Sequence, residues 1–597
     1  MTTSGYTAIA HRTVRGARMF VPRVWANVHA SWRMIVAFVV YATLIAVVTP
    51  PVVAWYIRIV FYAFALIVFW VVWGRRSDAT AVVLTATERR WYRVLLLIAG
   101  ATLIVSRILP FLRYGEVPLG YDTGFYLSSV DGSLDGIITG IGHRTVRALI
   151  WLPLVWLGIP KIVYLHGLYV LAQVLIAGAL YAFVRTITTH SRLAYGATAA
   201  FLFAVSIPQF FVYWWMYYQT ELAIAFLLAM LTLLTRRSFL ALLVGGFGAA
   251  LHPATSLPFA VALVVFLIIQ LLRSLVRLRP LDRDSGFLLF LAVLATLIAG
   301  QFFGEIDAFA RAYLRATTLT YGWLLNDYPI HLQPQMSGLY VTLPVVHLAS
   351  FYLLPFVCLS IVLFVFRTLS SDDRTRRQFL FLIIYGAVLL TLNVMGVIYA
   401  NRYLIYLDLV LIVIASPALI RFMRHLPRDR MGSVVVVLLF AGLLFHGGRI
   451  VAKQEAHITP AELAEVKAIG TQAELDAYAM TTISHYTPWL LAFSGRATID
   501  PGYLQYNQWS YAQWQEFWSG KSDVRRHELL RYYRRPIYVF VGSNALEETL
   551  PYIPFIQNDP SFERVSPHVW RYDPQSLTAE DMESLRLLER AQREGAS

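Results

Sequence analysis

The sequence predicts a polytopic α-helical membrane protein that carries a small external α/β domain at its C-terminal end. Three observations lead to this fold class. Of the 597 residues, 58% are hydrophobic and only 14% are charged, whereas soluble domains carry about a quarter charged residues. The apolar residues gather in runs, many of them long enough to cross a bilayer. After about Arg449 these runs stop, and the remaining chain holds more than half of the 35 acidic residues.

Residues 1–33 form a basic segment that we expect to be a cytoplasmic leader. His11, Arg12, Arg15 and Arg18 precede the first apolar run. No small-residue cleavage site follows that run, so a secretory signal peptide is not predicted.

Residues 34–448 form the predicted membrane domain, which contains about thirteen candidate spans. The spans lie near residues 34–48, 52–74, 93–112, 162–184, 193–211, 219–235, 239–251, 258–272, 286–303, 343–366, 379–398, 403–420 and 432–447. Pro50 and Pro51 separate the first two runs, because proline cannot continue a helix.

Arginine clusters alternate with charge-free turns along these spans. The turns at 49–51, 212–218 and 252–257 contain no Arg or Lys, whereas the intervening loops are rich in Arg. Basic loops remain in the cytoplasm in multi-span proteins. The alternation therefore predicts a cytoplasmic N-terminus and an external C-terminus.

Two external loops are predicted to be long, residues 113–161 and 304–342. The first contains "LGYDTGFYLSS" (119–129) and the Trp-rich run "ALIWLPLVWLG" (148–158). That run is too short to span the membrane, and its composition predicts a helix lying in the headgroup layer. The second loop is aromatic and polar, and it would lie on the same side of the membrane.

Residues 449–597 are predicted to form the external α/β domain. "PAELAEVKAIG" has the composition of a helix, and "ELDAYAMTT" and "PIYVFVG" have that of short strands. The last stretch, "TAEDMESLRLLERAQREGAS", predicts a charged C-terminal helix.

Composition and motifs exclude several classes of function. The net charge of +15 comes from arginines between spans, so membrane lipids and not nucleic acid are the expected partners. The single cysteine, Cys358, excludes disulfides and thiolate metal sites. The nucleotide-binding and hydrolase motifs G-x-x-x-x-G-K-[ST], H-E-x-x-H and G-x-S-x-G are absent. Because the ionisable residues gather at the external ends of mostly apolar spans, chemistry or binding at the interface is favoured over transport.

Asp122, in "GYDTGFY", is the candidate catalytic residue. A carboxylate at a membrane surface indicates function when it lies away from bulk water, but Asp is also a common helix N-cap. The two roles are compatible, since a capping carboxylate stays ionised and rigid. Tyr121 and Tyr126 supply flat faces beside it and are candidate substrate-binding residues.

Three further candidate substrate-binding residues lie at external ends of later spans. Glu221 begins the sixth span, where capping is the alternative role. His252 stands in the turn "LHPATS", where a purely structural role is the alternative. Arg402, in "NRYLIYLDLVLI", is a basic residue at a predicted external end, where few basic residues are expected. Its alternative role is structural, with the side chain extended to the membrane interface (snorkelling). Asp408, deeper in the same span, is a candidate partner of Arg402.

These features together resemble the C-fold membrane glycosyltransferases, which use polyprenyl-phosphate sugars. The resemblance rests on the acidic motif "GYDTGFY" in the first external loop, the outer "LHPATS" turn, the late "NRYLIYLDLVLI" span and the external C-terminal domain. It implies transfer of a sugar to a glycan, lipid or protein acceptor at the external face of the membrane. The absence of cysteines from the C-terminal domain favours a prokaryotic plasma membrane as that location. Family members often carry paired acids in this loop, whereas Asp122 is followed by Thr123 and Gly124. No metal ligands are therefore assigned, and a divalent cation remains an open cofactor.

The chemistry of such a transfer needs few groups. A base must take the proton of the acceptor hydroxyl, and cations must stabilise the departing phosphate. Asp122 is the expected base, and Arg402 or His252 could lie near the phosphate. The alternative function is a non-catalytic glycolipid-binding protein, a flippase or a transporter, for which Asp122 would be only a cap.

Overall fold

The structure is a computed structural model, and it describes most of the chain. The described residues are 32–48, 55–74, 84–115, 117–129, 150–187, 191–210, 218–278, 280–300, 311, 351–366, 373–394, 400–426, 430–501, 508–546 and 551–595. The predicted leader 1–33 and the second external loop 304–342 fall almost entirely outside this part of the chain.

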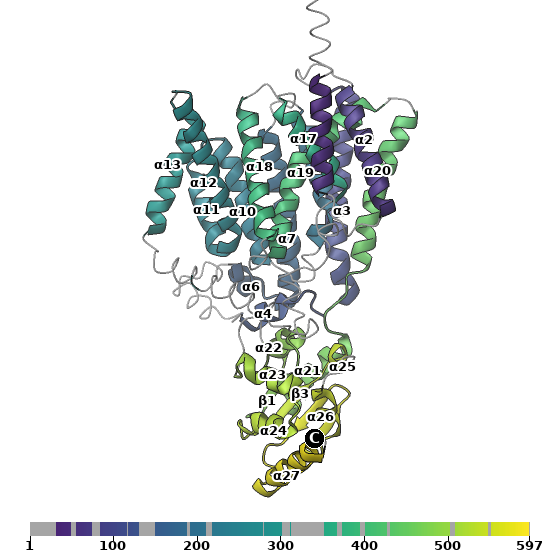
Figure 1. Ribbon diagram of the computed structural model, residues 1–597, viewed down its shortest axis with the longest axis vertical. Helices are drawn as coiled ribbons and strands as arrows, with labels where there is room; N and C mark the ends of the chain where they lie inside the picture. Colours follow the sequence, from purple (N-terminus) through teal and green to yellow (C-terminus); the bar gives the residue numbers. More distant parts are fainter. Residues whose placement is uncertain are drawn as a thin grey trace, which may run out of the picture.

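A bundle of long apolar helices forms the membrane domain (Figure 1). Its helices are Trp32–Val48, α2 (Trp55–Gly74), α3 (Ala86–Tyr114), α7 (Lys161–Ile187), α8 (Arg192–Ala204), α10 (Tyr218–Thr235), α11 (Leu240–Leu251), α12 (Pro253–Val276), α13 (Arg283–Gly300), α17 (Leu354–Val365), α18 (Asp373–Val394), α19 (Ala400–His425) and α20 (Arg430–Ala452). Every one of the thirteen predicted runs overlaps one of them.

Six of the described helices are long and apolar enough to cross a membrane. They are Ala86–Tyr114, Lys161–Ile187, Tyr218–Thr235, Pro253–Val276, Asp373–Asn393 and Tyr403–His425. The protein is therefore an integral, multi-pass membrane protein. The total of thirteen spans and the direction of each remain predictions.

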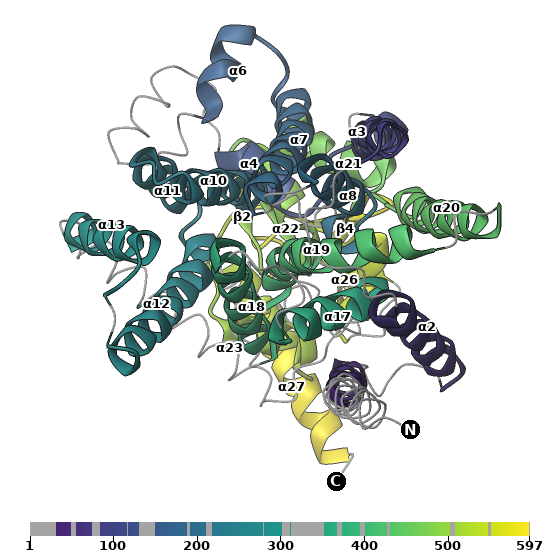
Figure 2. The same cartoon turned by 90° about the horizontal axis from the view of Figure 1, so that it is seen from above.

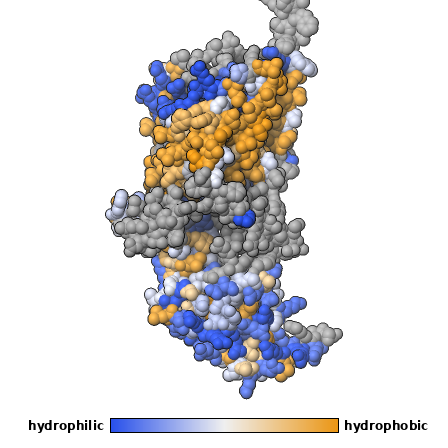
Figure 3. Space-filling model, turned by 90° about the vertical axis from the view of Figure 1, so that its left-hand side faces the viewer, coloured by the Kyte–Doolittle hydropathy of each residue, from blue (hydrophilic) through white to orange (hydrophobic). Residues whose placement is uncertain are grey.

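Helix α19 forms the centre of the bundle. It packs against α2, α8, α17 and α18, and Figure 2 shows these helices around it. Its apolar residues lie on all sides, as in "YLIYLDLVLIVIA", and a helix of that composition is stable only when it is surrounded. An apolar band covers the bundle in Figure 3, while the C-terminal domain is largely hydrophilic.

Two short helices lie between the bundle and the C-terminal domain (Figure 1). Helix α4 spans Asp122–Ser129, and α6 spans Leu152–Leu157 within the Trp-rich run. The side chains of Trp156 and Leu157 are 76% and 64% exposed. A short helix with such an exposed apolar surface is suited to the membrane interface, where the sequence predicted one.

The C-terminal domain is built on a five-stranded mixed sheet of order β2-β1-β3-β5-β4. The strands are β1 (Tyr478–Thr481), β2 (Ala497–Ile499), β3 (Ile537–Phe540), β4 (Phe562–Ser566) and β5 (Val569–Tyr572). The domain's helices are α21 (Pro460–Gln472), α22 (Thr487–Phe493), α23 (Tyr511–Ser519), α24 (Asp523–Arg531), α25 (Ser543–Leu546), α26 (Tyr552–Asn558) and α27 (Ala579–Gly595).

The predicted elements of this domain are confirmed. The two strand-like runs contain β1 and β3, which pair in parallel with Tyr478 opposite Ile537. The predicted first helix is α21, and the charged C-terminal stretch forms α27. Arg449 lies in the last turn of α20, which ends at Ala452, and the domain boundary at 449 stays a prediction.

Glu462 ties the first helix of the domain to the helix that follows β3. Its carboxylate accepts hydrogen bonds from Thr459 N (2.8 Å), Ser543 N (2.8 Å) and Tyr486 Oη (3.1 Å). Burial by itself would raise the pKa of this carboxyl. The donors of Thr459 and Ser543 outweigh burial and lower the pKa below its ordinary value.

Glu462→Ala is expected to lower the free energy of unfolding of the C-terminal domain by about 1–3 kcal/mol, because buried donors lose their acceptor. A lowered folded-state pKa means that the stabilisation is present above the unfolded pKa of about 4.3. It is lost as the pH falls through the lower, folded value. Urea unfolding between pH 7 and pH 3 should therefore show the wild-type and variant midpoints converging at acid pH. A constant difference across this range would contradict the assignment.

Candidate functional site

Asp122 lies at the junction of the two domains. Just before it, Val117 packs into the core of the C-terminal domain and Leu119 into the core of the membrane domain. Gly120 has a φ of 76°, a conformation that glycine adopts readily, and the chain turns there into α4. Thr123 Oγ1 donates to Leu119 O (2.5 Å) and secures the turn. Asp122 in the first turn of α4 is thus held from both sides.

Gly124 is the point of closest contact between α4 and the C-terminal domain. Helix α22 packs on α4, with Pro488 directly against Gly124. A Cβ atom at Gly124 would overlap the main chain of Pro488. Glycine is therefore needed here for close approach of two backbones.

Gly124→Ala is expected to loosen this docking at a cost of about 1–3 kcal/mol, as for other overpacked contacts. Limited proteolysis should release the C-terminal domain faster than in the wild type. Gly100→Ala in α3 is the matched control, because a Cβ there meets nothing within 4 Å. Equal cleavage rates for both variants would show that the close contact does not hold the domains together.

Tyr121 is buried at this junction, and the two carboxylates that raise the pKa of its hydroxyl come from different domains. Its side chain is only 3% exposed. Burial, and then the negative charges of Asp122 and Asp500, raise the pKa of its hydroxyl well above the usual value. Asp500 directly follows β2 and is itself 3% exposed. Tyr121 was expected to contact the substrate with its ring. Because its side chain is buried, we assign it instead to the packing around Asp122.

Asp500 was missed by the sequence reasoning. The signal available was "RATIDPGY", in which an acid follows a short strand-like run. Nothing in that run indicates a membrane surface, so only the docking of the C-terminal domain on α4 reveals that Asp500 lies near Tyr121.

Tyr126 connects Asp122 to the membrane helices. Its hydroxyl donates to Asp122 Oδ2 at 3.4 Å. Its ring packs edge-on against Tyr218 at the start of α10, with the ring centroids 4.2 Å apart. Tyr126 is only partly buried, so it can orient Asp122 while part of its side chain stays exposed.

Helix α6 forms an apolar border next to these aromatic rings. Trp151, just before the helix, packs edge-on against Tyr218 at 5.7 Å. Leu154 belongs to the same buried cluster, together with residues of α7 and α10. The exposed Trp156 lies two residues further along α6. The border thus presents hydrocarbon to the lipid beside the candidate site.

A network of charged and polar side chains lies inside the helix bundle. Arg107 in α3 donates from Nε to Gln173 Oε1 (3.1 Å), and Gln173 Nε2 donates to Glu221 Oε1 (2.7 Å). Arg107 also donates to Ala204 O (3.2 Å) and lies over the Phe210 ring at 4.1 Å. Arg107, Gln173 and Glu221 are each at most 1% exposed.

This network corrects two sequence-based expectations. The ionisable residues were expected to gather at the external ends of mostly apolar spans, yet Arg107 and Asp408 are buried inside the bundle. Glu221 was expected to bind substrate or cap α10, and instead its carboxylate faces the interior and accepts from Gln173. Arg107 was missed because a single Arg in "LIVSRILPF" leaves the run strongly apolar.

His252 and Asp408 make polar contacts that connect further helices of the bundle. His252 lies between α11 and α12, with Nδ1 2.7 Å from Thr255 Oγ1, which is 2.9 Å from Tyr406 Oη on α19. The predicted turn is confirmed, and the side chain is only 8% exposed. Asp408 accepts from Ser206 Oγ (2.6 Å) and Gln209 Nε2 (3.0 Å). These contacts fit the structural alternative for His252.

Arg402 lies in the first turn of α19, where only the backbone is described. Its proximity to the phosphate of a donor therefore stays a prediction. The loop 304–342, predicted to be external, falls outside the described residues except for Arg311.

The described residues contain no group of three or more His, Cys, Asp or Glu side chains that could hold a metal ion. Asp122 and Asp500 supply two carboxylates near Tyr121, and the described part of the chain adds no third ligand there. No metal ligands are assigned among the described residues, so no reaction step is assigned to a metal, and a divalent cation stays an open prediction.

Comparisons with known proteins show what this fold is similar to. No protein-family model and no curated protein matches the sequence. Among solved structures, an oligosaccharyltransferase from Archaeoglobus fulgidus, crystallised in complex with zinc and sulfate, matches with a TM-score of 0.51. The match covers 75% of this chain and 68% of that chain, with 12% sequence identity. At this identity the likeness shows a similar fold.

Proposed function

We propose that the protein is a glycosyltransferase that moves a sugar from a polyprenyl-phosphate donor to an acceptor hydroxyl at the external face of the membrane. The single observation that carries the proposal is the position of Asp122. A short helix holds it where the membrane bundle meets the C-terminal domain, with Tyr126 hydrogen-bonded to it and Asp500 nearby. The fold shared with an oligosaccharyltransferase supports the same class of reaction.

In the proposed reaction the acceptor oxygen forms a bond to the anomeric carbon while the bond from that carbon to the phosphate oxygen breaks. Asp122 takes the proton of the acceptor hydroxyl. The polyprenyl phosphate leaves with the electron pair of the broken bond. Because phosphate is a stable anion, no second carboxylic acid is needed to protonate the leaving group, in contrast to glycosidases.

Residues around Asp122 take the remaining roles in the proposed reaction. Tyr126 orients the Asp122 carboxylate, and the apolar border of α6 faces the hydrocarbon of the donor. Arg402 is the proposed cation for the departing phosphate, since an arginine can bind two phosphate oxygens at once. Glu221, bonded to Gln173, and His252, within hydrogen-bond distance of Thr255, are buried and are assigned to positioning helices rather than to contact with the donor.

The transporter or flippase alternative would need a polar route through the bundle. Two groups of described buried polar residues instead bond among themselves: Arg107 through Gln173 to Glu221, and Asp408 to Ser206. No specific observation favours the alternative over transfer.

The proposal is tested by incubating the full-length protein in lipid nanodiscs with a panel of radiolabelled polyprenyl-phosphate sugars and glycan, lipid and peptide acceptors. We expect one donor to be consumed, with release of polyprenyl phosphate and labelling of an acceptor. A parallel set with a chelator reports on a divalent cation. Tight binding of a donor without turnover under all conditions would support the non-catalytic alternative.

A further inference from the structure

Three basic residues meet where the neighbouring helices α3 and α20 end, on the side of the bundle that carries the C-terminal domain (Figure 1). Arg113 lies in the last turn of α3 and Arg449 in the last turn of α20, and Lys453 directly follows α20. Arg113 Nη1 donates to Ala452 O at 2.7 Å. Because Arg449 and Lys453 lie within one helical turn of Ala452, the three cations form one group, here called the α3–α20 cluster.

The positive charge of this cluster is not neutralised by the described part of the chain. Arg449 and Lys453 are exposed, and neither makes a hydrogen bond or ion pair to another described residue. Arg113 has two partners, Ala452 O and the Tyr114 ring at 5.2 Å, and both are uncharged. Glu455, two residues after Lys453, is the described acid closest in sequence. With Glu455 counted against the three cations, two positive charges remain.

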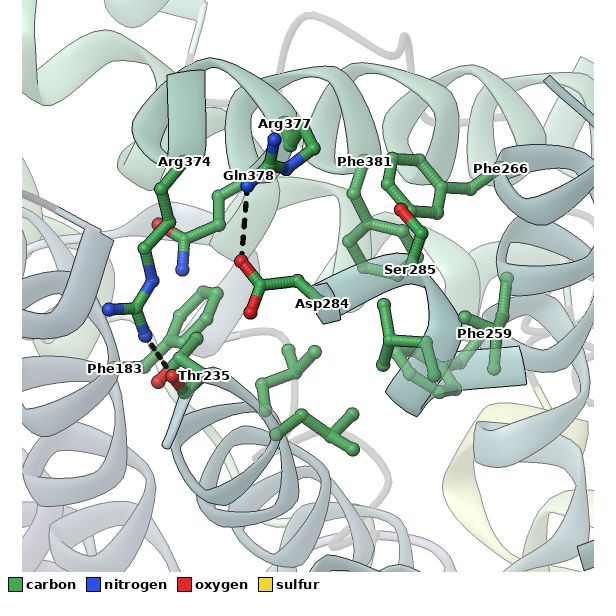
Figure 4. A pocket seen from close by; sticks show the side chains of 14 residues that line it. Phe183, Thr235, Phe259, Phe266, Asp284, Ser285, Arg374, Arg377, Gln378 and Phe381 are labelled. Atoms are coloured by element: carbon green, nitrogen blue, oxygen red, sulfur yellow. Dashed lines mark hydrogen bonds and ion pairs between the residues drawn. The ribbon is translucent and has the colours of Figure 1, made fainter. Parts of the chain in front are cut away.

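Arginines at the opposite end of the bundle already have partners (Figure 4). There Arg377 pairs with Asp284 at 3.1 Å, and Arg374 donates to Thr235 O. That end is predicted to be cytoplasmic, where basic residues are expected. The α3–α20 cluster lies at the predicted external end, where few are expected, and its excess charge indicates an anionic group from the surroundings.

Exposed apolar side chains on both helices lead up to the cluster. On α3, Val105 and Leu109 precede Arg113 by eight and four residues, so all three share one face. On α20, Phe445 likewise precedes Arg449 by four residues. These apolar side chains are 61%, 49% and 74% exposed. In a membrane such faces contact hydrocarbon, so each helix presents an apolar face with a cation at its end, which matches the acyl chain and charged headgroup of a lipid.

We propose that the α3–α20 cluster binds the headgroup phosphate of one anionic glycerophospholipid, whose acyl chains lie along the exposed faces of α3 and α20. Arginine and lysine are strong ligands for phosphate oxygens. A zwitterionic lipid carries its own ammonium group and gains less from the excess positive charge. Because Lys453 begins the segment that leads to α21, the bound headgroup also holds the start of the C-terminal domain at the membrane surface. The inference is independent of the proposed sugar transfer.

The test uses full-length protein, stripped of lipid in detergent and then equilibrated with equal amounts of phosphatidylglycerol and phosphatidylcholine. Native mass spectrometry counts the lipids retained. We expect one site to prefer phosphatidylglycerol by about tenfold, the scale expected for one or two cations near a membrane surface. Arg449→Gln/Lys453→Gln should lose this one preferred lipid. Arg113 is left unchanged, because it also caps the last turn of α20.

The matched control is Lys521→Gln/Arg534→Gln, which removes one Lys and one Arg from exposed positions of the C-terminal domain. These residues flank α24, which lies away from the bundle in Figure 1. The control should keep the preferred lipid. So should Arg449→Lys/Lys453→Arg, which exchanges the two side chains and preserves their charge.

Three outcomes would overturn the proposal. The first is equal retention of the two lipids by the wild type, and the second is equal loss in Arg449→Gln/Lys453→Gln and its control. The third is displacement of phosphatidylglycerol by an equal amount of either of two competitors. Displacement by polyprenyl phosphate would assign the cluster to the donor lipid, and displacement by glycerol phosphate would show that the acyl chains contribute nothing.

Discussion

Asp122→Asn is expected to lower the rate of sugar transfer by about 10²–10⁴-fold, the usual contribution of a general base. Asparagine has the size of aspartate and keeps an oxygen that can cap α4, but it cannot take the proton of the acceptor hydroxyl. The measurement is single-turnover transfer in nanodiscs with saturating donor. The loss should appear in the rate of the chemical step and leave donor binding nearly unchanged.

The matched control is Asp476→Asn, which removes an acid from an exposed position of the C-terminal domain. Asp476 contacts only Arg535, at 3.9 Å, among the ion pairs described, and its side chain is 63% exposed. This variant should transfer sugar at the wild-type rate. If Asp122→Asn matches it, with both proteins folded, then Asp122 is a cap and the proposed mechanism is wrong.

Arg107→Leu is expected to lower the free energy of unfolding by about 3–5 kcal/mol, because it leaves the Glu221 carboxylate without its nearby positive charge inside the bundle. The double variant Arg107→Leu/Glu221→Leu should recover much of this loss, since replacing both charges by hydrocarbon removes the cost of burying either. Thermal unfolding midpoints of both variants in one detergent would measure the difference.

Arg192→Leu provides the control for loss of an arginine, because Arg192 is exposed at the start of α8. It should change the free energy of unfolding by no more than an ordinary surface substitution does, about 0.5 kcal/mol. A double variant as unstable as Arg107→Leu alone would show that Glu221 does not depend on Arg107. The network would then be a set of separate hydrogen bonds.

The junction around Asp122 shows why one part of the candidate site could be predicted from the sequence and another part could not. Asp122 was identifiable because an acid among tyrosines and glycines interrupts an otherwise apolar chain. Asp500 lies 378 positions later, at the end of an ordinary strand, and carries no local signal. Its proximity to Tyr121 depends on α22 docking against Gly124, and such a contact between distant segments leaves no periodic pattern.

The sequence by itself determined the class of fold. The apolar runs, their prolines and the change of composition after Arg449 were enough, because each reports on local burial in lipid or water. The tertiary structure alone decided which polar groups meet: Arg107 with Gln173 and Glu221, and His252 with Thr255. A buried charge is stable only beside its partner, and which partner is available depends on how the helices pack.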